Sequence, residues 1–246
     1  MLSRYLPVFI ILSLIAEILG TVGGFGSSVF FVPVAHYFLD FQSVLGITAL
    51  FHLSSNVTKI AFFKKGFDKK LVIYLGVPAV VFVFIGGVLS NYLDPKILAI
   101  SLGIFLVFLS LLFLLYKKVV FRESKKNAII GGTLSGFCAG VLGTGGAIRG
   151  ITMSAFKLNK DRFIATSAVI DLAIDFTRSI VYYFNGYIHH HDIYLIPILT
   201  GVGIVGTYMG KKILDHISQE QFRNGVLILI LLIGICTVGL SLYELI

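Results

Sequence analysis

The sequence predicts an all-α integral membrane protein built from two inverted repeats of about five helical segments each. Three observations predict this fold class: a composition poor in charge, a spacing of glycines and prolines that occurs twice, and basic residues confined to alternate loops. Of the 246 residues, 57% are hydrophobic and 13% are charged, and the mean hydropathy is +0.96. Soluble domains carry about 25% charged residues, so the composition indicates a chain embedded in a membrane.

Several apolar stretches are long enough to cross a bilayer. The stretches 71–92, 97–116 and 225–243 carry no charged residue, and each is close to the ~20 residues that a membrane helix needs. In lipid the backbone N–H and C=O groups must be paired within the segment, which favours helices. The alternating segments of ~10 residues that make a membrane β-barrel are missing from the sequence.

The spacing of glycines and prolines indicates an internal repeat. The stretch Gly20–Gly26 resembles Gly140–Gly146, at an offset of 120 residues. Three further pairs keep this order at an offset of 119 or 120: Pro78 and Pro197, Gly66 and Gly186, and Gly86 and Gly206. Similarity between apolar helices copies composition more readily than it copies such spacing. We therefore predict one transmembrane domain made of the repeats 1–120 and 121–246.

Each predicted repeat divides into five helical segments. These are 5–20, 27–39, 43–63, 71–92 and 96–116 in the first repeat, and 127–142, 146–156, 162–184, 193–211 and 222–243 in the second. The first two segments of each repeat are short: at a rise of 1.5 Å per residue, 27–39 would extend only ~20 Å. Glycine-rich turns separate the two members, so we expect each pair to be a re-entrant or broken helix hairpin. Such backbone is tolerated at membrane depth only where protein or a water-filled cavity covers it.

The basic residues predict the orientation in the membrane. One set of loops holds fourteen of them: Lys64, Lys65, Lys69, Lys70, Lys117, Lys118, Arg122, Lys125, Lys126, Lys157, Lys160, Arg162, Lys211 and Lys212. The opposite set holds only Arg4 and Lys96. The positive-inside rule places the first set in the cytoplasm, so both termini are expected outside a multi-pass protein of the cell (inner) membrane. The first repeat then runs from outside to inside and the second from inside to outside, an arrangement typical of alternating-access transporters.

The third segment of each repeat carries a polar stripe at helical spacing. The stripes are Thr48, His52, Asn56 and Lys59 in the first repeat, and Ser167, Asp171, Asp175 and Arg178 in the second. Steps of four and three residues place each set on one helix face. Charges at the bilayer centre are unfavourable by at least ~2.5 kcal/mol, so both stripes should face the interior of the bundle.

These stripes predict a substrate site between the repeats. Lys59 and Arg178 would bind or steer an anion, and Asp171 and Asp175 would carry a coupling proton or hold the arginine in place. The alternative is structural: Asp175 and Arg178 neutralise each other within one helix, and Lys59 extends to the cytoplasmic surface. Glu17 also lies in an apolar segment; it has no evident partner in the sequence and is a weaker candidate for coupling.

The glycine turns predict a second part of the same site. A helix N-terminus presents unpaired N–H groups and a partial positive charge, so two such ends aimed at one point would bind an anion. The candidate residues of the two turns are Gly23, Gly24, Gly26, Ser27 and Ser28, and Thr144, Gly145 and Gly146. The alternative is that the glycines only permit close helix packing. Arg149 follows the second turn, where the first repeat has Val29, and is either a substrate-binding group or the ion-pair partner of an aspartate.

These paired motifs resemble the TauE/SafE group of sulfite-exporter-like permeases over nearly the whole chain. The first half carries Gly23–Gly26, Pro33 and Gly46–Thr48, and the second carries Gly143–Gly146, Ala165–Ser167 and Asn185–Ile188. Thr166, in the middle of Ala165–Ser167, joins the candidate substrate-binding residues. The chain departs from the family pattern at Phe25, which interrupts the first glycine turn, and at Met153, which matches Pro33. The resemblance implies export or uptake of small sulfur-containing anions such as sulfite, sulfonates or thiosulfate.

The sequence thus predicts a secondary transporter of small anions, driven by a proton or sodium gradient. The alternative is a passive channel. An enzyme would need a nucleophile–base pair, a set of metal ligands or a phosphate-binding loop, and the sequence has no such motif. We expect no cofactor and no nucleic-acid partner, and the partners are the substrate, the coupling ion and the lipid bilayer. The run His189–Asp192 invites a metal assignment, but adjacent loop residues seldom all reach one ion, so we expect a solvated loop.

Overall fold

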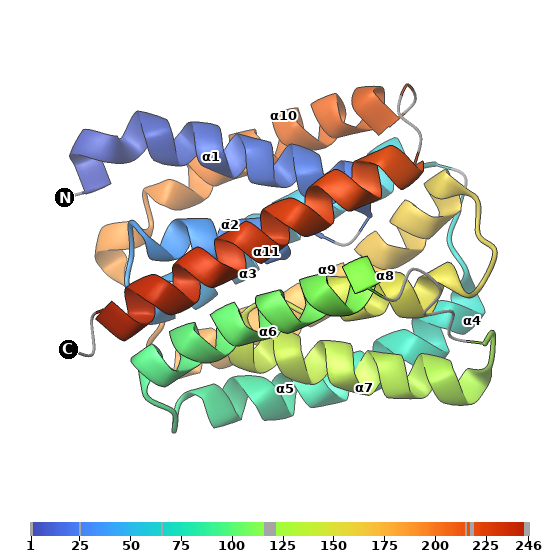
Figure 1. Cartoon of the computed structure of the whole chain (residues 1–246), viewed down its shortest axis with the longest axis horizontal. Coiled ribbons are helices and arrows are strands. Elements are labelled where there is room, and N and C mark those ends of the chain that lie inside the picture. Colours follow the sequence, from blue (N-terminus) through green and yellow to red (C-terminus); the bar gives the residue numbers. More distant parts are fainter. Residues whose placement is uncertain are drawn as a thin grey trace.

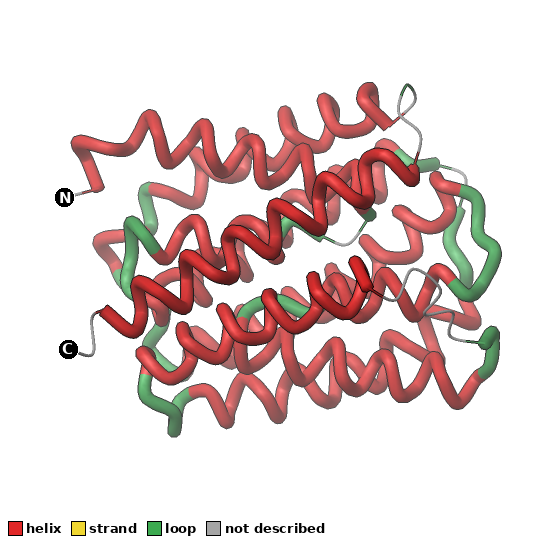
Figure 2. The backbone as a smooth tube through the Cα atoms, in the orientation of Figure 1, coloured by secondary structure: helices red, strands yellow, loops and turns green. Residues whose placement is uncertain are grey.

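The computed structural model describes residues 2–24, 26–64, 66–115, 122–214, 216 and 219–243. Its helices are α1 (Leu2–Gly23), α2 (Ser28–His36), α3 (Phe41–Phe62), α4 (Lys69–Leu71), η1 (Val72–Gly76), α5 (Val77–Ser90), α6 (Pro95–Leu115), α7 (Lys125–Leu142), α8 (Gly146–Ser154), α9 (Lys160–Phe184), η2 (His190–Asp192), α10 (Leu195–Leu214) and α11 (Gln219–Tyr243). The described part of the chain has no strand (Figure 2). Phe25, Lys65, Lys117 and Lys118, which the sequence argument used, lie outside the described residues.

The ten predicted segments correspond to ten helical stretches, but one expectation about the short pairs is wrong. Helices α2 and α8 are short, with 9 residues each, whereas their partners α1 and α7 have 22 and 18. Gly20 does not end α1; a Cβ on it would clash with the backbone of Ser27, so the glycine permits α2 to begin directly against α1. Each pair therefore combines one long helix with one half-length helix.

Three helices of the described chain are long and apolar enough to cross a membrane, namely Tyr5–Gly23, Lys69–Ser90 and Pro95–Leu112, and Leu227–Leu242 is a shorter apolar helix. Large apolar side chains such as Ile73, Val77 and Phe108 face outward. The span Lys69–Ser90 contains the π-helical turn η1, which precedes Pro78. The described part of the chain is thus all-helical, and its long apolar helices are suited to a membrane.

The helices pack mainly in four pairs. Helix α3 lies against α9, α1 against α10, α5 against α7, and α6 against α11. In Figure 1 the α1–α10 pair and the α5–α7 pair form opposite edges of the molecule, and the first turn of α1 and the last turn of α11 lie at the same end. The largest apolar cluster surrounds α2 and the first half of α3, with Phe30, Phe31 and Phe51 at most 1% exposed.

The turns before α2 and α8 bring the two short helices into the interior. Gly24, Gly26 and Gly143 have φ angles of 68°, 84° and 74°, a left-handed conformation that glycine adopts without strain. The Ser135 hydroxyl on α7 donates to the Gly145 carbonyl (2.8 Å) and ties the second turn down. As a result, the chain doubles back after α1 and after α7, so that α2 packs against α3 and α8 packs against α9.

Candidate functional site

A polar cavity lies between α2, α3, α8 and α9, beside the two glycine turns. It is lined by Gly26, Ser27, Ser28, His52, Asn56, Lys59, Ala139, Gly143, Gly145, Gly146, Arg149, Asp171, Ile174, Asp175 and Arg178. The cavity volume is about 10 Å³, which is room for roughly one water molecule. Both short helices begin at its wall, since Ser27 and Ser28 start α2, and Gly145 and Gly146 start α8.

One wall of the cavity is an arginine–aspartate pair that joins α8 to α9. The Arg149 side chain is 1% exposed, and its Nη2 donates to Oδ2 of Asp171. Its Nε donates to the Ser167 hydroxyl at 3.1 Å. Gly26 lies directly beside this pair, because a Cβ on it would be 3.5 Å from Nη2 of Arg149. The backbone before α2 therefore lies next to the charged groups, at a distance where a side chain on Gly26 would contact them.

A second pair, Arg178 and Asp175, lies one turn further along α9. Nε of Arg178 is 2.8 Å from Oδ1 of Asp175, and both side chains are at least 95% buried. The other carboxylate oxygen accepts a hydrogen bond of 2.7 Å from the Asn56 amide on α3. Arg178 also donates to the Gly143 carbonyl at 2.7 Å. The arginine thus connects α9 to the second glycine turn, and the aspartate connects α9 to α3.

His52 occupies the centre of a chain of polar contacts. Nη2 of Arg178 lies 3.3 Å from its Nδ1, and a guanidinium can only donate, so Nδ1 is the acceptor. In the neutral ring Nε2 then carries the proton and points to the Ser27 hydroxyl at 2.9 Å, which donates to Oε2 of Glu17. His52 and Ser27 therefore link the cavity to a carboxylate that is not on its wall.

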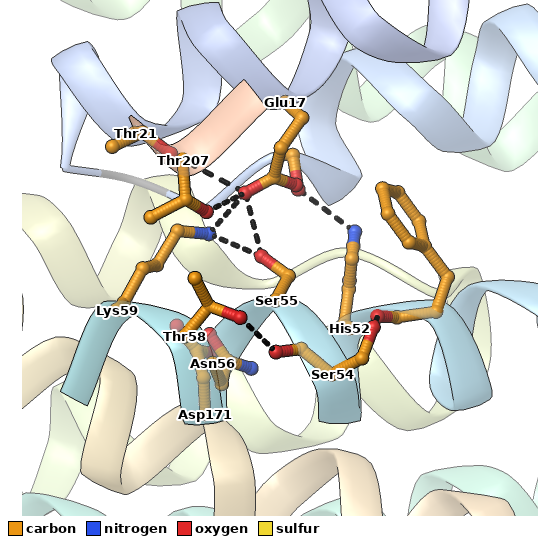
Figure 3. A network of polar contacts seen from close by, with 12 residues as sticks. Glu17, Thr21, His52, Ser54, Ser55, Asn56, Thr58, Lys59, Asp171 and Thr207 are labelled. Carbon is orange, nitrogen blue, oxygen red and sulfur yellow. Dashed lines mark hydrogen bonds and ion pairs between the residues drawn. The ribbon is translucent and has the colours of Figure 1, made fainter. Parts of the chain in front are cut away.

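Glu17 is the buried centre of a second polar cluster (Figure 3). Its side chain is 0% exposed and forms an ion pair of 2.7 Å with Nζ of Lys59. Besides Ser27, it accepts hydrogen bonds from three hydroxyls on three helices, those of Thr21, Ser55 and Thr207. The Lys59 ammonium also donates to Ser55 at 2.8 Å. Lys59 therefore does not extend to the surface, and Glu17 does have a partner.

The role of Glu17 as a hub was underestimated from the sequence, because its partners lie far along the chain. Lys59 is 42 positions away and Thr207 is 190 positions away. The available signal was the carboxylate itself inside an apolar segment, since such a group is almost always paired in the bundle interior.

Most of the predicted site residues gather at the cavity, but six do not form its wall: Gly23, Gly24, Thr48, Thr144, Thr166 and Ser167. Thr144 and Ser167 stand directly behind it, because they accept hydrogen bonds from Ser28 and Arg149. Thr48 and Thr166 donate to carbonyl groups one turn earlier in their own helices, and Thr166 also accepts from the Asp68 backbone. Gly23 and Gly24 shape the turn, and Gly24 packs against Phe163.

The charges around the cavity balance. Three cationic side chains (Lys59, Arg149 and Arg178) are paired with three carboxylates (Glu17, Asp171 and Asp175). The cationic side chains are between 1% and 6% exposed. With all six groups ionised and His52 neutral, this part of the interior has no net charge.

Two comparisons with known proteins agree with each other. The sequence model of the family described as Sulfite exporter TauE/SafE matches residues 9–237. A relative from Methanocaldococcus jannaschii, named Probable membrane transporter protein MJ0441, is 29% identical over 241 residues. The match covers 89% of this chain and 90% of that protein. The similarity therefore extends over all the helices that surround the cavity.

Proposed function

Because the chain belongs to the TauE/SafE family of sulfite-exporter-like membrane transporters, we propose that it is a secondary transporter of small sulfur-containing anions of the sulfite, sulfonate or thiosulfate class. An ion gradient drives it, and the substrate binds in the cavity between α2, α3, α8 and α9. The observation that carries this proposal is the convergence of three buried cations and two helix N-termini on one cavity.

The chemistry of the cavity suits an oxyanion. The guanidinium groups of Arg149 and Arg178 present N–H donors in a planar fork, which matches the paired oxygens of a sulfite or sulfonate group. The first N–H groups of α2 and α8 add donors and a partial positive charge. Ser27 and Ser28 supply hydroxyls at the same wall.

The charge balance of the cavity supports proton coupling. An anion entering a neutral, buried site leaves one uncompensated negative charge, which is unfavourable at low dielectric. A proton on Asp171 or Asp175 removes that charge and releases the paired arginine to bind the anion. Glu17 could also carry the coupling proton, because hydrogen bonds through Ser27 and His52 connect it to the cavity. We therefore favour the proton over sodium as the coupling ion.

The helix pairs support two inverted repeats, 1–120 and 121–246, as the basis of alternating access. Under this division α3 corresponds to α9 and α6 to α11, and each contacts its counterpart. The α1–α10 contact corresponds in the same way to the α7–α5 contact. The cavity then lies where the repeats meet, so that a rocking motion of one repeat against the other would open it to each side in turn. The small size of the cavity supports a carrier over a passive channel, the alternative, because a channel needs a continuous path.

Anion-dependent thermal stabilisation of the purified protein tests the proposal. The panel contains sulfite, sulfate, thiosulfate, sulfoacetate, taurine and non-sulfur carboxylates, since a ligand that binds only the folded state raises its stability. We expect at least one sulfur oxyanion or sulfonate to raise the unfolding temperature in the wild type. Arg178→Lys keeps the cation but loses the planar fork, so the shift should shrink; in Arg178→Ala it should vanish.

Arg162 on the same helix is the matched control, because its side chain is 44% exposed and pairs with Asp68 away from the cavity. Arg162→Ala should therefore respond to the anion like the wild type. The substrate proposal fails if only carboxylates or cations stabilise the wild type. The site proposal fails if the sulfur anion stabilises both Arg178 variants as strongly as the wild type.

A further inference from the structure

A histidine-rich turn lies between α9 and α10, outside the cavity. His189 precedes the 3-10 turn η2, which contains His190, His191 and Asp192. The sequence suggested a solvated loop, yet three of the four residues converge. One ring nitrogen of His189, one of His191 and one carboxylate oxygen of Asp192 all lie within 4.8 Å of one another. His190 is exposed and does not belong to this group.

Asp192 is the unusual member of the cluster. The residue is 2% exposed, and its Oδ2 has no hydrogen-bond partner among the described residues. The groups facing this oxygen are Nε2 of His191 at 3.5 Å and Nδ1 of His189 at 3.9 Å. A buried carboxylate oxygen without a hydrogen-bond partner is strongly unfavourable in an apolar environment. The oxygen therefore needs a positive group at the point where the two imidazoles meet.

Protonated histidines are a poor solution to this need. The rings of His189 and His191 are stacked, with centroids 5.3 Å apart and planes 8° from parallel. Two imidazolium ions in this arrangement would repel each other face to face. A single divalent cation would instead take an electron pair from each neutral imidazole and from the carboxylate. One ion thereby compensates the buried oxygen and uses both rings.

The donor set indicates the class of metal. Two imidazoles and one carboxylate suit Zn²⁺ and neighbouring transition metals, whereas Mg²⁺ and Ca²⁺ prefer oxygen ligands. Zinc bonds of about 2.0–2.1 Å in a tetrahedron place neighbouring ligand atoms roughly 3.4 Å apart, close to the 3.5 Å between His191 and Asp192. The Ser43 hydroxyl lies 2.6 Å from Nδ1 of His189, so this ring would bind the ion through Nε2, because a metal-binding histidine is commonly oriented by a hydrogen bond at its other ring nitrogen.

From this geometry we propose that His189, His191 and Asp192 form a binding site for one divalent transition-metal ion, with Zn²⁺ as the best match. Solvent completes the coordination, since the His191 side chain is 74% exposed. Through Ser43 the site touches the first turn of α3. A bound ion would therefore fasten the α9–α10 connection to the helix that carries His52, Asn56 and Lys59. This inference does not depend on the transported substrate.

The test is Zn²⁺ binding by the full-length protein, purified without a polyhistidine tag and titrated at neutral pH against a chromophoric zinc chelator. We expect one ion per chain in the wild type. His191→Ala should weaken binding by at least about 10-fold, the scale at which even ligand-supporting residues act, and its exposure allows the variant to fold. Asp192→Asn should weaken binding as well, and His190→Ala is the matched control that keeps wild-type affinity.

Substitution of Co²⁺ for Zn²⁺ gives a second readout, because the visible absorption of bound cobalt reports its ligands. The spectrum of the wild type should be retained in His190→Ala and lost in His191→Ala. The proposal is overturned if the wild type binds no stoichiometric zinc. It is also overturned if His191→Ala keeps wild-type affinity or if His190→Ala loses as much affinity as His191→Ala.

Discussion

The α5–α7 and α1–α10 pairs form opposite edges of the molecule, and glycines shape both, in different ways. On α7, Gly132, Gly136 and Gly140 face the backbone of η1 and α5, where a Cβ would clash with the carbonyls of Leu75, Ala79 and Val83. On α10, the atoms nearest to Gly206 and Gly210 are instead side-chain atoms of Glu17 and Thr21 on α1. A Cβ on Gly206 would be 2.8 Å from Cβ and Cγ of Glu17.

The difference shows that glycines at a helix contact can have two different roles. In the α5–α7 pair the small residues let two backbones touch, as is common between membrane helices. In the α1–α10 pair they leave room for a carboxylate, and α10 supplies Thr207 as one of its hydrogen-bond donors. The first pair is therefore a structural contact, and the second holds a charged group that reaches the candidate site through Ser27 and His52.

The largest expected effect on stability comes from removing the Glu17 carboxylate, which is present in the α1–α10 pair and has no counterpart in the α5–α7 contact described above. Glu17→Ala leaves the Lys59 ammonium buried without its counterion, so we expect a loss of about 3–5 kcal/mol in the free energy of unfolding. Denaturant or thermal unfolding in detergent measures this loss. Lys59→Met in the same chain should recover part of it. Glu123→Ala, in an exposed turn, should change stability by less than ~0.5 kcal/mol; an equal loss in both variants would contradict the assignment.

Adding a methyl group at a glycine of α7 tests whether close backbone contact stabilises the α5–α7 pair. Gly136→Ala places a Cβ against the Ala79 carbonyl, which cannot yield as a side chain can, so we expect a loss of about 1–3 kcal/mol. Gly201→Ala is the control, because nothing lies within 4 Å of its Cβ position; it should be neutral or stabilise α10 by up to ~1 kcal/mol. Thermal unfolding compares the two. A tolerated Gly136→Ala would show that the helices can separate at no cost.

A methyl group at the corresponding contact of α10 should have a smaller effect on stability. Gly206→Ala places a Cβ 2.8 Å from Cβ and Cγ of Glu17, a less severe overlap than the 2.1 Å between a Cβ on Gly136 and the Ala79 carbonyl, so we expect a loss of about 1 kcal/mol. The same overlap should disturb the contacts from Glu17 to Ser27, and the anion-dependent stabilisation should change with it. If Gly206→Ala destabilises more than Gly136→Ala, the two pairs do not differ in the way described.

The smallest effect is expected outside both pairs, at the N-terminus of α3. The Asp40 carboxylate accepts a hydrogen bond of 2.9 Å from the Ser43 backbone. Asp40→Ala should lower the free energy of unfolding by about 1 kcal/mol. Asp40→Asn should lower it less, because asparagine also caps helices. Burial raises the pKa of Asp40, but the hydrogen bonds that Ser43 donates, together with the electrostatic attraction of the nearby His189, lower it by more. The pKa therefore lies below its ordinary value of 3.8.

A depressed pKa in the folded protein fixes the sign of the pH effect. The stabilisation by Asp40 is present above its ordinary pKa and is lost as the pH falls through the lower value. The difference in stability between the wild type and Asp40→Ala should therefore be constant at neutral pH and shrink below pH 3.8. Unfolding curves over an acid series measure it. A difference that grows on acidification would contradict the capping role.

Local patterns in the sequence were enough to predict the helices and much of the cavity. The spacing of His52, Asn56 and Lys59 placed them on one face of α3. Charged side chains within a membrane almost always face the interior of the helix bundle, because contact with lipid is unfavourable. Hydroxyls have another option, since they can bond to the preceding turn of their own helix. Thr48, which the spacing placed at the site, does so, and so does Thr166, which the family resemblance added. Neither therefore lines the cavity.

Contacts between distant segments were beyond what spacing can predict. The Glu17–Lys59 pair depends on how α1 packs against α3, and no periodicity within either helix encodes that packing. The length of α1 was underestimated for a related reason. Gly20 resembles a helix end in the sequence, but the approach of α2 requires a glycine there while the helix continues.

The match of three cations with three carboxylates also has an electrical consequence. Moving one elementary charge through a membrane potential of 100 mV is worth about 2.3 kcal/mol. An empty carrier whose interior groups sum to zero would move no such charge when it turns from one side to the other. Its return step would then be insensitive to voltage, and the membrane potential could act only on steps that carry substrate or protons. Currents in a reconstituted bilayer should therefore be absent without substrate. With substrate they should appear only where the charges of the anion and of its coupling protons do not cancel.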